Sequence, residues 1–159
     1  MANLHVVLFR PRIPPNVGTI GRTCLGVGAQ LHLVEPLGFD LDDDRKLRRA
    51  GLDYWRHVRV ERHPSWEAFV DTTLHTFDQA VFFSKSEKFG SEPLAGFEFD
   101  TGAHSVALMF GSEVEGIDFL PEVVIEAHPR VYLPMGDAIR SYNLSNVASV
   151  GVFEALRQR

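Results

Sequence analysis

The chain has 159 residues, 45% of them hydrophobic and 23% charged, a composition that is ordinary for one globular domain with a substantial core. Its single cysteine, Cys24, excludes an internal disulfide and a cysteine-based metal cluster, and its place in an apolar helical pattern indicates a buried structural thiol. No apolar run approaches the ~18 residues of a membrane helix, and residues 1–10 are too short and too strand-like for a signal peptide. We therefore expect one cytoplasmic domain over residues 1–159, with no membrane contact.

Charge is distributed unevenly along the chain. The net charge of −5 does not by itself favour a nucleic-acid partner, but residues 45–62 carry a net +5, which leaves −10 for the remainder. A local basic face suits contact with phosphates at one place. A solvated helix face, balanced by the acidic residues 42–44, explains the same pattern equally well. The seven histidines are scattered through the sequence, so we expect no metal site.

Short apolar runs alternate with helical patterns along the whole chain. The expected strands are 4–9, 30–34, 58–61, 80–84, 105–110 and 130–135, and the expected helices are 17–27, 43–51, 66–76, 121–127 and 144–157. This alternation predicts an α/β fold with a mostly parallel sheet and helices on both faces. Asn16 and Ser65 are the expected caps of the first and third helices, and Asn143 or Ser141 that of the last. Residues 87–102 are expected to form an exposed loop.

Three segments place glycine, arginine or small polar residues directly after an apolar strand. They are Leu8-Phe-Arg-Pro-Arg-Ile-Pro-Pro-Asn-Val-Gly-Thr-Ile-Gly-Arg-Thr-Cys24, Leu108-Met-Phe-Gly-Ser-Glu-Val-Glu-Gly116 and Leu133-Pro-Met-Gly-Asp-Ala-Ile-Arg-Ser-Tyr-Asn-Leu-Ser-Asn146. In the third, an arginine and four small hydrogen-bonding side chains crowd one turn, which a loop built only to connect two elements does not need. Such groups are what an enclosed polar ligand and a ribose-phosphate substrate require.

Together the three segments resemble the three signature motifs of the SPOUT superfamily of S-adenosylmethionine-dependent RNA methyltransferases. The closest resemblance is to the small TrmL-like family, which methylates the ribose 2'-OH of the wobble nucleotide (C34/U34) in tRNA. It covers nearly the whole chain and includes the linking segments 31–39 and 47–54. It implies a deep trefoil knot in the C-terminal part of the sheet, with crossings after Phe110 and Met135. The implied partners are the tRNA anticodon stem-loop and a second copy of the chain, which would contact the final helix and the first motif.

The resemblance also implies a set of site residues. The cofactor, S-adenosyl-L-methionine, would bind at Phe83, Gly111, Gly116, Leu133, Met135 and Ser141. Catalysis would rest on Arg22, Ser141 and Asn143, and substrate RNA would meet Asn16, Arg10, Arg12 and Arg140. Because a guanidinium is a poor base, we interpret Arg22 as a phosphate clamp and electrostatic stabiliser. Glu113 either offsets cofactor charge or binds a loop amide. The aromatic residues Tyr142, Trp55 and Phe39 are either core residues or stacking partners for an unpaired base.

Some positions depart from the family pattern and leave the RNA target open. Glu115 stands where related wobble methyltransferases often carry a basic residue, Ile117-Asp118 replaces a Leu-Pro ending, and the loop 136–139 is distinct. Another tRNA position, or ribosomal RNA, is an alternative target for the same chemistry. A catalytically silent RNA-binding module is a further alternative, which the intact Arg22, Ser141 and Asn143 disfavour. A Rossmann-type or phosphate-loop protein is excluded, because no matching glycine-rich motif occurs.

Overall fold

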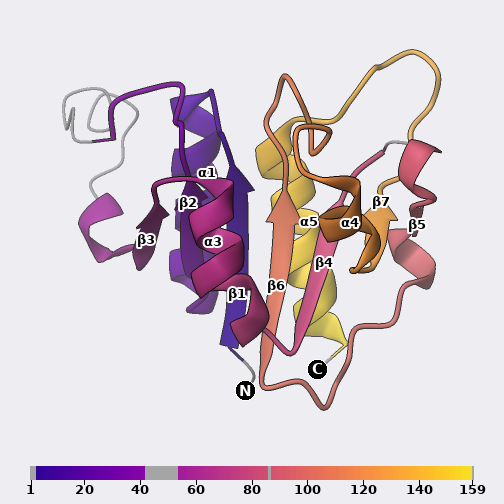
Figure 1. Cartoon of the computed structure of the whole chain (residues 1–159), viewed down its shortest axis with the longest axis horizontal. Coiled ribbons are helices and arrows are strands. Elements are labelled where there is room, and N and C mark those ends of the chain that lie inside the picture. Colours follow the sequence, from indigo (N-terminus) through magenta and orange to yellow (C-terminus); the bar gives the residue numbers. More distant parts are fainter. Residues whose placement is uncertain (1–2, 42–53, 86, 159) are drawn as a thin grey trace.

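A computed structural model describes residues 3–41, 54–85 and 87–158 of the chain (Figure 1). Its centre is a seven-stranded sheet in the order β3-β2-β1-β6-β4-β7-β5, and every strand pair is parallel. The strands are β1 (Asn3–Phe9), β2 (Gln30–Val34), β3 (Val60–His63), β4 (Gln79–Phe83), β5 (Glu92–Pro93), β6 (Ser105–Phe110) and β7 (Arg130–Tyr132). The expected helix 43–51 and the basic residues 45–49 lie outside the described residues.

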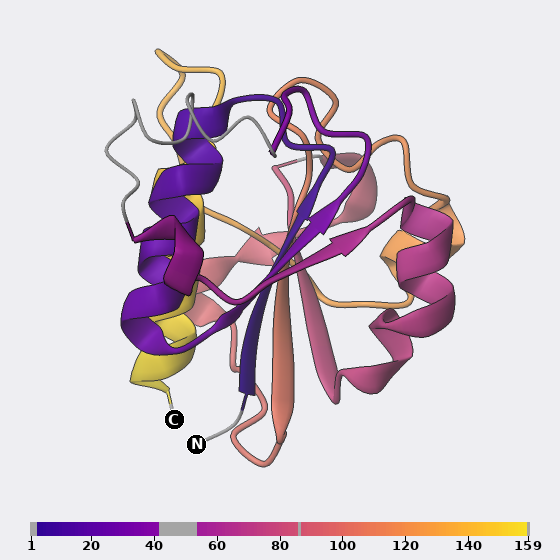
Figure 2. The same cartoon turned by 90° about the vertical axis from the view of Figure 1, so that its left-hand side faces the viewer.

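Helices cover both faces of the sheet, as the alternating pattern predicts. Figure 2 shows α1 (Pro14–Val27) and α5 (Leu144–Arg157) side by side on one face, and α3 (Trp66–Thr72) and α4 (Glu122–Glu126) on the other. Two clusters of buried apolar side chains fill the layers between sheet and helices. Because the central strands are covered on both faces, β6 is an almost fully buried apolar run, which is typical of parallel sheets.

The first helix is shaped by prolines, glycines and close packing. Pro14 and Pro15 occupy its first turn, where a missing N–H costs nothing, and Gly28 ends it in the left-handed conformation with φ 73°. Cys24 is fully buried, and burial raises the pKa of its thiol to about 12, which agrees with a structural role. Gly21 lies against the ring of Trp55, where a Cβ would overlap the indole. Trp55 is thus a packing residue, and Phe39 also packs against the core.

Two of the three helix caps expected from the sequence are present in the structure. Ser65 and Asn143 cap α3 and α5 as expected, each accepting a hydrogen bond from a backbone N–H of the first turn. The expectation that Asn16 caps α1 is wrong, because the helix begins two residues earlier and Ile13 is its N-cap residue. Helix α3 ends at Thr72 and a separate 3₁₀ turn, Leu74–Thr76, follows it.

The segment 87–102 is not the exposed loop that its composition suggests. It contains two 3₁₀ turns and the short strand β5, and it buries Phe89, Leu94, Phe97 and Phe99 against the sheet. Strand β7 is shorter than expected and ends at Tyr132, while β3 begins two residues later than expected. The trefoil knot stays a prediction.

The two ends of the described chain lie near each other at one end of the sheet (Figures 1 and 2). Strand β1 begins at Asn3 and α5 ends at Arg157 there, whereas the carboxyl ends of the central strands lie at the opposite end. Among the described residues, none of the helices has the length and apolar character that crossing a membrane requires.

Candidate active site

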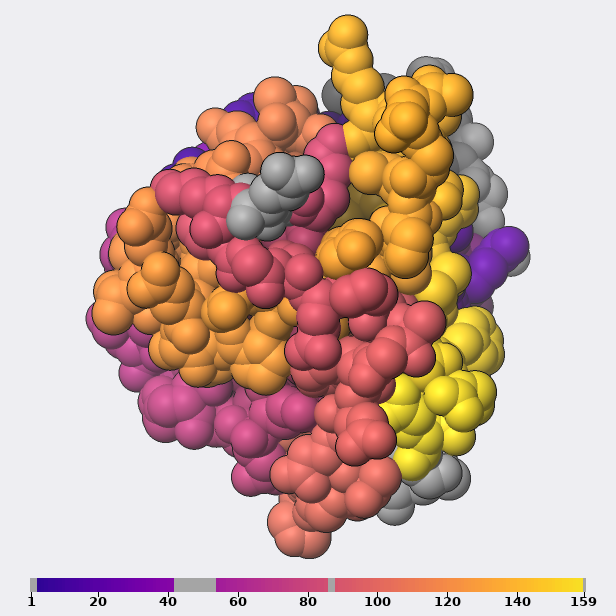
Figure 3. All heavy atoms as spheres, turned by 90° about the vertical axis from the view of Figure 1, so that its right-hand side faces the viewer, coloured from indigo at the N-terminus to yellow at the C-terminus, as the bar shows by residue number. Residues whose placement is uncertain are grey.

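A pocket of about 530 Å³ lies where the carboxyl ends of four adjacent strands meet. Its walls come from the loops that follow β1, β4, β6 and β7 and from the first turns of α5. Figure 3 shows the loop after β7, in orange, standing above a hollow on this face of the molecule. Open α/β sheets bind their ligands at this edge, and the volume is that of an ordinary small-molecule site.

The pocket brings together most of the residues that the sequence selected. It is lined by all six residues expected to hold the cofactor (Phe83, Gly111, Gly116, Leu133, Met135 and Ser141) and also by Asn143 and Asn16. These residues are far apart in the sequence and meet because parallel strands end at the same edge of the sheet. The third segment, 133–146, supplies one whole wall, from the end of β7 to the start of α5.

One side of the pocket is apolar and rigid. Phe83 stacks on Phe110 with 4.6 Å between ring centroids, and its ring lies so close to Gly151 of α5 that a Cβ there would overlap it. Leu133, Leu144 and Val147 continue this wall. An aromatic ring held between a strand and a helix gives a flat surface on which a planar apolar group of a ligand can lie.

The loop after β6 forms the opposite wall and closes on itself. Ser112 and Gly116 form an isolated antiparallel bridge, and Gly116 takes φ 60°, a conformation that favours glycine. A Cβ on Gly111 would overlap the backbone of Gly116. Gly111, expected from the sequence to contact the cofactor, does line the pocket. In the structure the close approach at this glycine is by the chain itself, so Gly111 is required for the loop to close.

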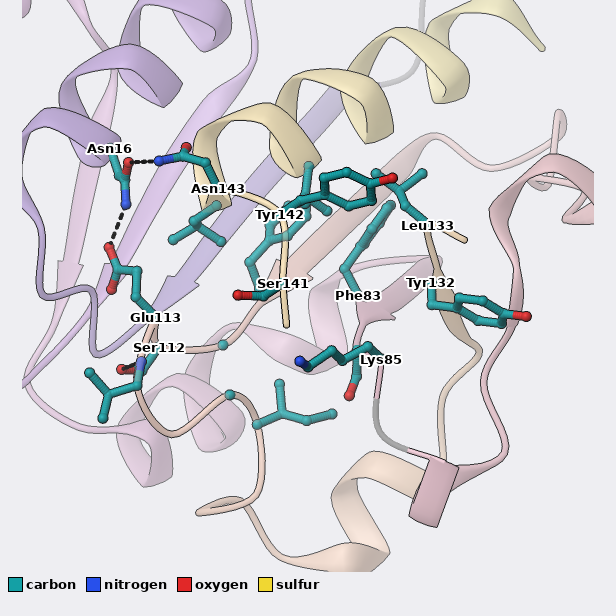
Figure 4. Close-up of a pocket in the computed structure, with 18 of the residues that line it drawn as sticks. Asn16, Phe83, Lys85, Ser112, Glu113, Tyr132, Leu133, Ser141, Tyr142 and Asn143 are labelled. Carbon is teal, nitrogen blue, oxygen red and sulfur yellow. Dashed lines mark hydrogen bonds between the residues drawn. The ribbon is translucent and has the colours of Figure 1, made fainter. Parts of the chain in front are cut away.

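Asn16, Glu113 and Asn143 join three loops through one hydrogen-bonded chain (Figure 4). The Glu113 carboxylate accepts from the backbone N–H of Arg12 (2.8 Å) and of Ile13 (3.2 Å), and from the side-chain Nδ2 of Asn16 (3.0 Å). The Asn143 amide donates to Asn16 Oδ1 (3.0 Å), while its own Oδ1 accepts from Ser145. Of the two roles considered for Glu113, the structure therefore shows the amide-binding one.

This chain of contacts fixes the first, second and third segments relative to one another. Asn16 is buried, with only 4% of its surface exposed, and both ends of its amide are used. A buried amide leaves a costly unpaired group if either partner is lost. Glu113, which the sequence did not place among the expected cofactor, catalytic or RNA-binding residues, is the residue on which the loop after β1 depends. Its position directly after a strand, next to Gly111 and Ser112, is the sequence signal that marked it.

Several pocket residues were not anticipated from the sequence. Lys85 follows β4 and its amino group points toward Ser141 across the pocket (Figure 4). Tyr142, considered earlier as a stacking partner, lines the pocket with 41% of its surface exposed, and its hydroxyl donates to the Pro134 carbonyl at 3.0 Å. Lys85 sits in a sequence without a recognisable motif, and only its place after a central parallel strand indicates a site residue.

Arg22 lies apart from the residues with which it was grouped. It is exposed on α1, its guanidinium lies 4.5 Å from the ring centroid of Tyr54, and it does not line the pocket. Within one copy of the chain, therefore, the arrangement unites Ser141 and Asn143 but not Arg22.

Arg10 and Arg12 of the first segment lie near an acidic residue of the second segment. Glu115 lies 3.8 Å from Arg10 and 4.0 Å from Arg12, and all three side chains are partly exposed. Arg10 follows the end of β1 and has a positive φ of 49°. Its guanidinium lies over the ring of Phe119. Its Nε is buried and has no hydrogen-bond partner among the described residues. Arg140, on the loop after β7, is exposed. In the described part of the basic block, Arg62 pairs with Glu35 and Arg59 donates to the Gly28 carbonyl.

Replacing Glu113 tests the hydrogen bonds that connect the three loops. In Glu113→Gln, one acceptor oxygen becomes an NH₂ group that faces backbone donors, so we expect the free energy of unfolding to fall by ~1–2 kcal/mol in urea titrations. Glu98→Gln is the control, because Glu98 is exposed and lies outside the pocket lining. Equal stability of Glu113→Gln and wild type would contradict the structural role given to Glu113.

Comparisons with known proteins show the family to which this chain is similar. A model of the SpoU rRNA Methylase family matches residues 3–153. The tRNA (cytidine(34)-2'-O)-methyltransferase of Burkholderia cenocepacia (strain HI2424) is 46% identical over 157 residues, which cover 97% of this chain and 94% of that protein. The protein of the same name from Yersinia pestis is 42% identical over 159 residues, with coverages of 98% and 93%.

Two solved structures extend the likeness to three dimensions. One, described as giving structural insights into the 2-OH methylation of C/U34 on tRNA, matches with a TM-score of 0.80 and 40% identity and covers 99% of this chain and 96% of that one. The other is an AdoMet-bound rRNA methyltransferase from Sinorhizobium meliloti, with a TM-score of 0.81, 27% identity and coverages of 98% and 56%. On the extent of the family match and the identity to full-length relatives, this chain belongs to the SpoU rRNA Methylase family.

Proposed function

We propose that this protein transfers a methyl group from S-adenosyl-L-methionine to the ribose 2'-OH of the wobble nucleotide, C34 or U34, in the anticodon loop of tRNA. The observation that carries the proposal is the pocket, in which the three sequence segments meet at one edge of the sheet. Relatives more than 40% identical over nearly the whole chain bear the name of this activity. Since the relatives are named for a tRNA substrate, we place the reaction in the cytoplasm.

The pocket residues suit S-adenosylmethionine by their chemistry. The flat apolar wall of Phe83, Leu133 and Val147 suits an adenine ring, and backbone groups at the strand ends can bond its edge. The polar rim of Ser141, Asn143 and Lys85 suits the hydroxyl and carboxylate groups of the cofactor. When bound, the cofactor supplies a methyl group activated by its sulfonium. The residues of the chain align the ribose hydroxyl with that group, exclude water and assist loss of the hydroxyl proton.

The residues around the pocket mouth divide this work. Asn143 is held by Asn16 at the helix start, so its position is set before any substrate arrives. Ser141 and Asn143 orient the substrate from the loop after β7. The arginines 10, 12 and 140 and Lys85 give the RNA phosphates cationic partners. The RNA has to compete with Glu115 for Arg10 and Arg12.

In a homodimer, Arg22 of one copy could lie next to the pocket of the other copy. Helices α1 and α5 pack side by side, and their outer surface exposes Leu25, Val150 and Phe153, the last with 60% of its surface accessible. Large exposed apolar groups that cluster are typical of a protein interface. We infer a homodimer through this face, in which Arg22 of one copy reaches the RNA bound at the other.

The test of the function is methyl transfer itself. Radiolabelled S-adenosylmethionine is incubated with the protein and with tRNA that lacks the wobble methyl group, and the product nucleosides are mapped by mass spectrometry. We expect 2'-O-methylcytidine or 2'-O-methyluridine at position 34, and no product from Leu133→Trp, whose indole fills the pocket. Cofactor binding without tRNA methylation would redirect the search to other tRNA positions or ribosomal RNA. Absence of cofactor binding would leave only an RNA-binding module.

The Arg22→Ala variant tests whether Arg22 acts on the tRNA phosphate and not on the cofactor. Since Arg22 does not line the pocket, we expect cofactor affinity to stay near the wild-type value while kcat/KM for tRNA falls ~10²–10³-fold. Lys88→Ala, which removes another exposed cation, is the control. Mixing Arg22→Ala with Leu133→Trp chains should restore activity, because a mixed dimer holds one intact pocket facing one intact arginine. Equal loss of cofactor binding and transfer would contradict the phosphate-clamp role.

Glu115→Gln tests the competition at the pocket mouth. Removing this carboxylate frees Arg10 and Arg12 for phosphates, so tRNA should bind several-fold more tightly at low salt, with a steeper decrease of affinity as salt rises. Glu98→Gln makes the same charge change outside the pocket lining and should leave both quantities nearly unchanged. An unaltered salt dependence in Glu115→Gln would show that the two arginines do not contact the RNA.

A further inference from the structure

Four titratable side chains gather on strands β1, β2 and β3, and none of them lines the pocket. His5 of β1, His32 of β2, and Glu61 and His63 of β3 lie on the sheet face that α3 covers. The register explains the grouping, because His32 pairs with Glu61, and His63 follows two residues later on the same side of β3. The histidines, which are scattered in the sequence, are therefore brought together by three neighbouring parallel strands.

The donor atoms of this group lie close enough together to share one metal ion. His32 Nδ1 lies 3.0 Å from His63 Nε2, Glu61 Oε2 lies 3.6 Å from His32 Nδ1, and Glu61 Oε1 lies 3.8 Å from His63 Nε2. Nitrogen and oxygen ligands that stand about 2.0–2.2 Å from a tetrahedral Zn²⁺ ion are separated from one another by ~3.3–3.6 Å. One donor atom from each of the three residues lies within 4.8 Å of the other two. Small side-chain movements therefore bring the three donors to the separations of a tetrahedral site, and water completes the coordination.

The chemical state of the ligands also fits. His32 and His63 are 2% and 4% exposed, and burial is the main cause that lowers the pKa of each, for His32 to about 3. Both rings are therefore neutral at physiological pH, the form that binds a metal. The Glu61 carboxylate is about half exposed and opens the group to solvent, which gives an ion a way in.

The residues around His32 and His63 can hold the two rings in a fixed orientation, as a metal ligand requires. The second nitrogen of His32, Nε2, lies 2.9 Å from His5 Nδ1, so that a metal on Nδ1 leaves Nε2–H to donate to His5. Such an outer hydrogen bond fixes the tautomer and orientation of a ligating histidine. Phe69 packs edge-on against His63 and Phe77 lies against His5, with centroid separations of 5.0 and 4.8 Å, and these rings keep water from the inner side of the group.

We propose that His32, His63 and Glu61 bind one Zn²⁺ ion, with His5 as the outer hydrogen-bond partner and water as the fourth ligand. The ion would join β2 to β3, the four-residue strand at the edge of the sheet. It lies outside the pocket lining and takes no part in methyl transfer, so its role is to hold this edge in place. Without an ion, the same residues form only a row of neutral, hydrogen-bonded histidines.

Metal binding by the isolated protein tests the proposal without any assay of RNA. The full chain, free of an affinity tag and stripped with a chelator, is titrated with Zn²⁺ in competition with a chromophoric chelator, and separately with Co²⁺. We expect one ion per chain, the visible absorption of a tetrahedral Co²⁺ centre, and a higher thermal midpoint with Zn²⁺. Absence of stoichiometric binding, or an octahedral Co²⁺ spectrum, would overturn the proposal.

Substitutions identify the ligands. Glu61→Gln and His63→Gln should each lower Zn²⁺ affinity at least ~10-fold, and His5→Gln should lower it by ~10–100-fold through the outer hydrogen bond. His75→Gln, which removes an exposed histidine, should change nothing. Should His63→Gln fail to fold, Glu61→Gln still decides, because its side chain is half exposed. Unchanged affinity in Glu61→Gln would place the ion elsewhere and overturn the assignment.

Discussion

The buried amide of Asn16 is the constraint on which the pocket depends. It joins the carboxylate of Glu113 to the helix cap of Asn143, and in this way it ties the loops after β1, β6 and β7 to one another. Each of these loops lies at the rim of the sheet and carries polar groups that apolar packing does not orient. A hydrogen-bonded amide specifies distance and direction as apolar contacts do not, and it keeps the three walls in register before any ligand binds.

The rest of the site follows from strand order. Because β1, β6, β4 and β7 are adjacent and parallel, each delivers its following loop to the same edge. The glycines at 111 and 151 remove side chains where the backbone or an aromatic ring approaches closely, and Gly116 takes a positive φ, so that the loop after β6 can close and Phe83 can lie flat against α5. Rigid elements thus carry the apolar wall, while loops fixed by hydrogen bonds carry the polar one.

The sequence was sufficient for the layers of the fold and for most of the pocket, since hydrophobic periodicity and the polar segments after strands are local signals. It was insufficient where partners are distant. Asn16 looked like a helix cap because an asparagine before an apolar helix usually is one, and only the structure shows that its partners are Glu113 and Asn143.

Residues 87–102 looked like a loop because isolated Phe and Leu side chains among Gly and Pro have no hydrophobic period, although this segment buries four apolar side chains. Arg22 was grouped with Ser141 by resemblance alone, and nothing in one copy of the chain brings them together.

The placement of the chain ends has a consequence for how this domain can be built into larger proteins. Asn3 and Arg157 lie at the amino-terminal end of the strands, while the pocket opens at the carboxyl end. A domain fused to either end would therefore begin on the side away from the pocket and leave its entrance clear. Both ends could also serve one fused module together, since they lie near each other. The Sinorhizobium meliloti structure, of which this chain covers 56%, shows that the same fold exists within a much longer polypeptide.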